Sequence, residues 1–265
     1  MFERGKKRAQ ITVFVIVVII IISATVSFFI FRKEAVIEIG GKPGENPGTF
    51  LNTCIKDKVR EGVEVISLHG GYIDNPLHKN FKFENEDYVN ISYLCYTQNN
   101  YVQCINQKPA LKEDLRHEIK NYIEKTVKNC FDVMETNFLQ TNDDASVSNR
   151  GFEVHILPKR IIIQTDSDIS LTKSGETIQY ENIKVSIASR LFEILSTVQE
   201  LVNQEAEFCY AESLGIAITY PEFTIEKIKT VDTIIYSVEH EGSKEKFRFA
   251  IRTCVIPAGL VGIGN

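Results

Sequence analysis

The chain has 265 residues, of which 25% are charged and 43% are hydrophobic, and its formal net charge is −5. This length leaves room for one large domain or two small ones. The negative charge disfavours nucleic acid and anionic lipid as main partners, because both repel an acidic protein.

An uncharged apolar segment at residues 11–31 is the most informative feature of the sequence. As a helix it would be about 30 Å long, enough to cross the hydrocarbon core of a bilayer. Four basic residues precede it within the first eight positions. Because Lys and Arg are retained on the cytoplasmic side, the sequence predicts a cytoplasmic N-terminus at residues 1–10. It also predicts a single transmembrane helix at 11–31, in contact with lipid, and an extracytoplasmic C-terminal domain at the cell membrane.

Two alternatives for this segment stay open. Small residues at 23–27 offer a cleavage site for a secretory signal peptide. Against cleavage, residues 28–31 prolong the apolar run to spanning length and a basic pair closes it. The other alternative is a buried core helix, in which eight consecutive Val and Ile residues would be unusual.

Residues 32–49 are rich in Gly and Pro and predict a flexible linker. Two amphipathic helices are expected beyond it, because apolar residues recur every three or four positions over 51–66 and again over 111–138. Gly70 and Gly71 can end the first helix through a left-handed cap. We therefore expect a helix–hairpin–helix subdomain at residues 50–140.

The hairpin of this subdomain is expected at Asn99-Asn100, a pair suited to a two-residue type I′ turn. Cys95 and Cys104 are symmetric about that turn and would face each other across the two strands. The alternation counted from the turn makes them a non-hydrogen-bonded pair, whose close approach is compatible with a disulfide.

The remaining cysteines are also expected to form disulfides, because the extracytoplasmic compartment is usually oxidising. Cys54 and Cys130 each fall on the apolar face of a predicted helix, so a bridge can tie the two helices. Cys209 and Cys254 then pair by elimination. The alternatives are buried thiols or zinc ligands, although no Cys pair has the short spacing typical of zinc sites.

The hydrophobic period changes to two beyond the polar residues 142–146. Strands are expected at 152–156, 161–163, about 178–185, 216–220, 233–238 and 247–251, and a helix at about 188–212. We expect residues 150–265 to form an α+β subdomain with an antiparallel sheet and a helix on one face. The predicted fold class is therefore α+β, with one N-terminal transmembrane helix and a disulfide-braced ectodomain.

No catalytic, cofactor or metal site is predicted. The five histidines lack metal-ligand spacing, and no Gly-x-Ser-x-Gly nucleophile motif occurs. The sequence His69-Gly70-Gly71 could offer oxyanion amides, but a helix cap explains it better. The acidic clusters at 84–87, 143–144 and 166–168 lack EF-hand spacing. Asn90 begins an Asn-Ile-Ser sequon, so it is a possible glycosylation site on the outer side.

The stretch from Lys7 to Phe14 resembles the class III signal peptides of archaeal pilin-like proteins. The resemblance implies cleavage between Ala9 and Gln10, with the apolar helix kept on the mature protein. Many such pilins carry Glu at the fifth mature position, where this chain has Phe14.

The Gln-Ile-Thr-Val-Phe opening is also similar to that of uncharacterised archaeal membrane-anchored surface proteins. In these, a Cys-bearing helix precedes Gly-Gly-Tyr-Ile, here residues 70–73. That family has no assigned activity, so the resemblance implies location rather than function.

The leading hypothesis is a non-enzymatic surface protein for adhesion, recognition of a protein partner or envelope structure. The first alternative is a pilin-like subunit that assembles through its apolar helix after cleavage at Ala9-Gln10. The second is an ectoenzyme with an unrecognised site. No cofactor and no nucleic-acid partner are expected under any of these hypotheses.

Overall fold

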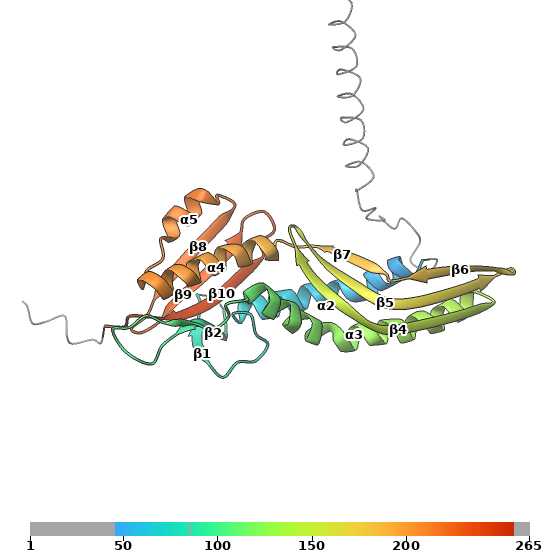
Figure 1. Ribbon diagram of the computed structural model, residues 1–265, viewed down its shortest axis with the longest axis horizontal. Helices are drawn as coiled ribbons and strands as arrows, with labels where there is room; N and C mark the ends of the chain where they lie inside the picture. The colour runs from blue at the N-terminus through green and yellow to red at the C-terminus, as the bar shows by residue number, and fades with distance from the viewer. Residues whose placement is uncertain (1–45, 85, 257–265) are drawn as a thin grey trace, which may run out of the picture. The chain divides into compact units, whose positions relative to one another are not determined.

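The computed structural model describes residues 46–84 and 86–256, which form a mixed α+β domain with three disulfides (Figure 1). The predicted cytoplasmic tail, the apolar segment 11–31, nearly all of the linker and the processing site at Ala9-Gln10 lie outside these residues. Within the described ranges, no helix combines the length and apolarity that a membrane crossing requires.

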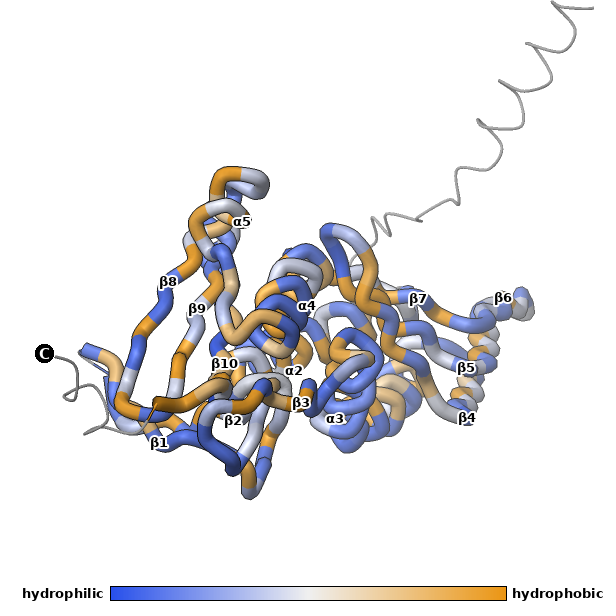
Figure 2. Tube along the Cα trace, turned by 60° about the vertical axis from the view of Figure 1, so that its left-hand side comes forward, coloured by the Kyte–Doolittle hydropathy of each residue, from blue (hydrophilic) through white to orange (hydrophobic). Residues whose placement is uncertain are grey.

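The first sheet has the strand order β1-β2-β10-β9-β8, with β3 paired to β2. Its strands are β1 (His78–Lys82), β2 (Tyr88–Tyr96), β3 (Ile105–Asn106), β8 (Phe223–Lys229), β9 (Ile234–His240) and β10 (Lys246–Arg252). Neighbours are antiparallel except β2 and β10, which run parallel. The helix α4 (Leu191–Phe208) packs on β9 and β10. Polar and apolar residues alternate over the first half of β8, where Phe223 and Ile225 pack against the core (Figure 2).

The second sheet is antiparallel and consists of β4 (Asp144–Leu157), β5 (Arg160–Lys173), β6 (Glu176–Glu181) and β7 (Lys184–Ala188). β6 and β7 pair with successive halves of β5, where one strand near 178–185 is predicted from the sequence. The long helices α2 (Pro47–Leu68) and α3 (Leu111–Thr141) pack against each other and against this sheet. Both helices form where the apolar periodicity predicts them.

One hydrophobic core includes residues of both sheets and of α2, α3 and α4. The helix α2 contacts both β7 and β10, and therefore links the two sheets. Its apolar stripe is fully buried at Leu51, Ile55 and Ile66. Residues 50–140 and 150–265 thus contribute to a common core and, through β2 and β10, to a common sheet.

Disulfide bonding is confirmed, and the six cysteines join in the three pairs that the sequence favours. Cys54–Cys130 links α2 to α3 with a Cα–Cα distance of 6.1 Å. Cys95–Cys104 and Cys209–Cys254 have Cα–Cα distances of 5.3 and 5.8 Å. No free cysteine remains in the described part of the chain.

The predicted type I′ hairpin around Cys95 and Cys104 is wrong, although its disulfide is present. β2 ends at Tyr96, and Cys95 pairs in register with Asn106 rather than with Cys104. The connecting loop is held by the end of β10 instead. The Arg252 guanidinium donates to the Thr97 carbonyl, and the Cys254 amide donates to the Val102 carbonyl at 2.8 Å. Tertiary contacts thus override the local turn preference of two asparagines.

The predicted strand at 216–220 is also wrong, because Ser213–Thr219 forms the short helix α5. Ile216 is buried, whereas Leu214 and Ile218 are exposed. Leu214, Ile216 and Ile218 alternate with small residues in the sequence, a pattern that favours a strand. In the helix only Ile216 of the three is buried, so the alternation does not report burial here.

A buried ion pair lies between α4 and β8. Glu205 is fully buried, and its carboxylate lies 3.0 Å from the Lys227 ammonium, whose side chain is 15% exposed. Tyr236 on β9 donates its hydroxyl to the same carboxylate. Burial and the hydrogen bond to Glu205 raise the pKa of the Tyr236 phenol, so it stays protonated and keeps donating. The network therefore supplies a cation and a hydrogen bond to Oε1 of a carboxylate that would otherwise be costly to bury, while Oε2 has no hydrogen-bond partner.

The helix α2 ends at the predicted glycine pair. Gly71 has φ of +87°, its amide donates to the Ile66 carbonyl at 2.8 Å, and its carbonyl accepts from the Lys108 ammonium at 3.1 Å. A Cβ at Gly71 would lie 2.8 Å from Cδ1 of Leu115. The glycines therefore serve as a helix cap that α3 packs against closely.

Replacing Gly71 by alanine should lower the free energy of unfolding by about 2 kcal/mol, from left-handed backbone strain and overpacking together. Gly175 offers a matched control, since its φ is +85° and no atom lies within 4 Å of a Cβ built there. We expect Gly175→Ala to cost about 1 kcal/mol, from backbone strain alone. Urea titration measures both, and a Gly71→Ala cost no larger than that of Gly175→Ala would contradict the packing argument.

Candidate functional site

A cleft of about 840 Å³ lies where the C-terminal half of α2 meets the β7–α4 connection and the β9–β10 turn. Its floor is apolar and consists of side chains that are at most 3% exposed, namely Val59, Ile161, Ile187, Leu191 and Ile194. The lining comes from both sheets and from the helices α2 and α4, so the common core fixes the shape of the cleft.

Two buried polar atoms in the wall of this cleft have no hydrogen-bond partner. They are Oγ of Ser67 and Nε of Arg248, in residues that are 3% and 4% exposed. Buried polar groups are nearly always paired in folded proteins. The residues of these two atoms line the cleft, but the atoms themselves are shielded from solvent, so a ligand or an ordered water would satisfy them by entering the wall of the cleft.

Arg248 is held in a fixed orientation. Its two terminal nitrogens donate to the Glu86 carboxylate at 2.6 and 2.7 Å. The guanidinium lies over the Phe83 ring, 3.8 Å from the centroid. Arg248 also holds the pKa of the Glu86 carboxyl below its usual range, mainly through these hydrogen bonds. The guanidinium that carries the unpaired Nε is therefore already immobilised by Glu86 and Phe83.

Six basic residues and three acidic ones line the cleft, and four of the basic residues pair with carboxylates of the protein. Two of the three acidic side chains accept hydrogen bonds from other side chains of the protein. Glu245 accepts from the hydroxyls of Ser189 and Ser243 at 2.6 and 2.9 Å, and Glu86 is bound by Arg248. Among the described residues, Arg60 and Lys159 have no carboxylate partner. The arrangement is suited to an anionic group, because such a group would meet uncompensated positive charge.

Lys159 is placed by the tight β4–β5 turn. Its backbone has φ of +66°, and its amide donates to the Glu193 carboxylate at 3.0 Å. The turn carbonyl also accepts from the Ser189 amide at 3.2 Å, which fixes the turn beside the β7–α4 connection. The exposed Lys159 side chain therefore lies at the rim of the cleft.

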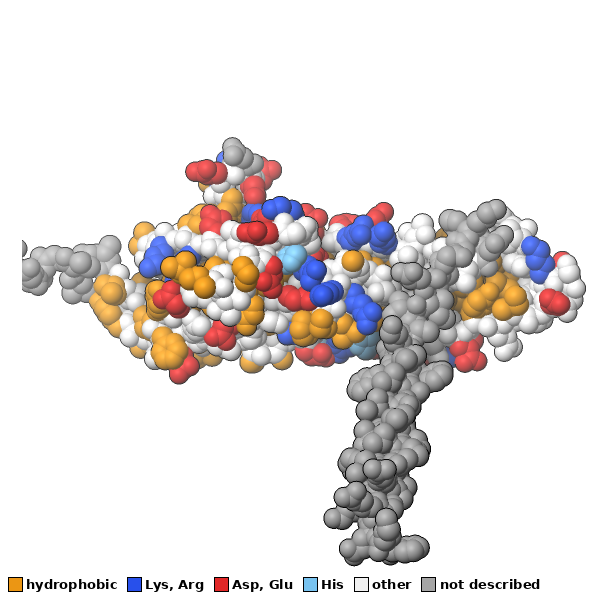
Figure 3. All heavy atoms as spheres, turned by 90° about the horizontal axis from the view of Figure 1, so that it is seen from above, with side chains coloured by type: hydrophobic (Ala, Val, Ile, Leu, Met, Phe, Trp, Pro, Cys, Tyr) orange, Lys and Arg blue, Asp and Glu red, His pale blue; other side chains and the backbone are white. Residues whose placement is uncertain are grey.

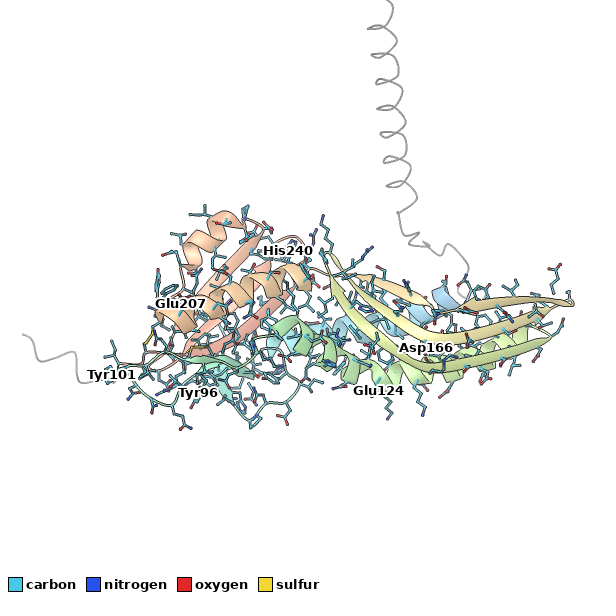
Figure 4. All side chains as sticks on the ribbon, viewed as in Figure 1. Tyr96, Tyr101, Glu124, Asp166, Glu207 and His240 are labelled. Atoms are coloured by element: carbon cyan, nitrogen blue, oxygen red, sulfur yellow. A yellow bond between two sulfur atoms is a disulfide. The ribbon has the colours of Figure 1, made fainter. Side chains whose placement is uncertain are left out.

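None of the residues singled out in the sequence lines this cleft, except Glu86 from the acidic cluster at 84–87. Asp166 and Asp168 both pair with Arg150 on the second sheet (Asp166 is labelled in Figure 4). Asn90 is exposed on β2, where its side chain accepts from that of Asn80 at 2.8 Å. In the described part of the chain, no group of three or more His, Cys, Asp or Glu side chains could hold a metal ion.

The basic residues of the cleft come from distant parts of the chain, which is why the sequence does not reveal them. They are Arg60, Lys159, Arg190, Lys244, Lys246 and Arg248. No short motif contains more than a few of them, and only the meeting of α2 with the two sheets brings them together.

The described residues thus define a disulfide-linked α+β domain with an electropositive cleft at the junction of its two sheets. No protein-family model, curated protein or solved structure matches this chain.

Proposed function

We propose that this protein is a membrane-anchored surface protein that binds a small anionic ligand in the cleft between its two sheets. The anchor is the apolar segment 11–31, flanked by basic residues on its N-terminal side, and the domain beyond it lies outside the cytoplasm. The disulfides support this location, because they persist in oxidising compartments.

The observation that carries the binding proposal is the pair of buried, unpartnered groups in a basic cleft, Nε of Arg248 and Oγ of Ser67. A carboxylate or phosphate oxygen could accept from either group, and the guanidinium donor would form a charge-assisted bond. The volume of about 840 Å³ lies in the range of small-molecule sites. The ligand class is therefore a small carboxylated or phosphorylated molecule with an apolar part for the floor.

Citrate and pyrophosphate are suitable probes, since they present clustered carboxylates and phosphates. We expect saturable binding of at least one of them to the full chain extracted from membranes in detergent, measured by calorimetry. Arg60→Gln with Lys159→Gln should weaken it about tenfold, because each substitution removes an uncompensated cation worth roughly 0.7 kcal/mol. Recovery of the chain in the membrane fraction tests the anchor in the same preparation.

The control is Lys125→Gln with Lys128→Gln, which makes the same change in net charge on the exposed face of α3. This variant should bind the probes like the unmodified protein. Binding of neither probe, or equal weakening in both double variants, would count against the cleft as an anion site.

A further inference from the structure

A second hollow of about 640 Å³ lies between α4 and α5 and shares no lining residue with the basic cleft. Four glutamates line it, and its lining contains no basic residue; the glutamates are Glu193, Glu200, Glu212 and Glu222. This groove therefore has the opposite charge from the cleft at the junction of the sheets.

Three of the four acidic side chains of the groove have no ion-pair partner among the described residues, whereas Glu193 pairs with Arg190 at 4.0 Å. Among the described residues, Glu200, Glu212 and Glu222 form no ion pair. Two of them accept hydrogen bonds from neutral side chains: Glu200 accepts from the Gln204 amide at 2.7 Å and Glu212 from the Tyr210 hydroxyl at 3.0 Å. Oε2 of Glu193 is buried and has no hydrogen-bond partner. Uncompensated carboxylates at a concave surface are complementary to Lys or Arg of a partner.

The groove is also apolar. Ile216 and Phe223, which are 6% and 4% exposed, form part of its floor, and the half-exposed Tyr220 forms part of its wall. Outside the groove, α5 presents Leu214 and Ile218, which are 68% and 73% exposed. Figure 3 shows hydrophobic side chains gathered on the part of the surface where α5 lies. A contiguous exposed apolar patch of this kind is typical of an interaction surface.

We propose that the groove between α4 and α5 docks a basic amphipathic helix of a partner protein. An apolar helix face would cover Ile216, Tyr220 and the α5 ridge, while flanking Lys or Arg side chains meet the glutamates. This is helix-in-groove recognition, in which side chains spaced three and four residues apart anchor the partner. The proposal does not depend on the anion cleft, although Glu193 contacts two residues of that cleft: it pairs with Arg190 and accepts from the Lys159 amide.

The segments of this chain outside the structure do not fit the groove. Residues 257–265 and 11–31 contain no basic side chain, and the three basic side chains of residues 32–45, Arg32, Lys33 and Lys42, are balanced by three glutamates in a segment rich in Gly. The basic residues of 1–10 precede the predicted membrane span and are assigned to the opposite side of the bilayer. The charge of the groove therefore selects a separate partner.

The test uses synthetic peptides of about four helical turns with the full chain in detergent. The probe has leucines on one face and lysines on the other, and a leucine–glutamate peptide of the same pattern is the charge-reversed control. A lysine–serine peptide separates charge from the apolar contact. We expect saturable binding of the leucine–lysine peptide alone, measured by fluorescence anisotropy.

The variant Glu200→Lys, Glu212→Lys, Glu222→Lys should weaken this binding by about a hundredfold, and Leu214→Ser with Ile218→Ser by about tenfold. These side chains are exposed, so the variants should keep the helical circular dichroism of the parent. The control variant is Glu124→Lys, Glu135→Lys, Glu176→Lys, with the same charge change at exposed sites elsewhere (Glu124 is labelled on α3 in Figure 4). It should bind within about twofold of the parent.

Equal weakening by the control variant, equal binding of the lysine–serine peptide, or no saturable binding would overturn the proposal. So would a concentration-dependent dimer of the parent chain that the groove variant abolishes, because the groove would then be taken by a second copy. Sedimentation velocity distinguishes that outcome from peptide docking.

Discussion

Replacing both Cys54 and Cys130 by alanine should lower the free energy of unfolding by about 4 kcal/mol. The bond joins residues separated by 76 positions and ties α2 to α3, the two helices that cover the second sheet. Without it the unfolded chain gains the conformational freedom of that long loop. Urea denaturation of the double variant and of the parent, both with the other two bonds intact, measures the difference.

The disulfide Cys95–Cys104 provides the comparison, because its separation is only 9 positions. Its removal should cost about 3 kcal/mol in the same entropy treatment. Comparison of the two double variants tests whether the length of the closed loop governs the loss of unfolding free energy. A larger loss for Cys95→Ala, Cys104→Ala would show instead that the short bridge is needed to hold its loop against β10.

Replacing Lys227 by methionine should destabilise the protein by about 3 kcal/mol, because it leaves the fully buried Glu205 carboxylate without its cation. Methionine keeps an unbranched side chain that is one atom shorter than lysine, so the loss reports mainly on charge. Lys229→Met is the matched control, since Lys229 is exposed on the same strand and forms no ion pair in the described part of the chain. It should change the unfolding free energy by less than about 0.5 kcal/mol.

A double variant separates the ion pair from the packing. Glu205→Leu combined with Lys227→Met replaces the pair by apolar side chains and should recover most of the loss. About 1 kcal/mol should remain, because Tyr236 then lacks its hydrogen-bond acceptor. Chemical denaturation at one pH measures all three variants. A Lys227→Met effect no larger than that of Lys229→Met would mean that water already solvates Glu205.

The sequence predicts those parts of the fold whose signals are local. The stripes of α2 and α3 repeat over many turns, and the residues of both predicted stripes are buried, together with a few others such as Gly62 and Phe131. The pairing of Cys54 with Cys130 can be predicted because both residues lie on these stripes. The glycine cap at Gly71 also has a local signal, because many helices end at a residue in the left-handed conformation that glycine favours.

The parts that escape prediction depend on contacts between distant residues. Hydrogen bonds from Arg252 and Cys254 set the conformation of the loop after β2. No residue near Asn99 and Asn100 indicates that these distant residues will contact the loop. The parallel pairing of β2 with β10 leaves no local signal either. The cleft escapes prediction because its cations are isolated in the sequence, and each is an ordinary surface residue until the fold assembles them.

The pairing of β2 with β10 also sets an order of events during synthesis. Tyr93 and Cys95 leave the ribosome long before their partners Ala250 and Ile251 exist. Until β10 is made, one edge of β2 has no strand to bond, although Leu94 and Ile91 on this strand belong in the core. Contacts so far apart in the chain slow folding and prolong the time that such an edge is exposed. The first sheet therefore closes only when the last strand is complete, so a nascent chain that stops before β10 carries an open strand edge rather than a finished sheet.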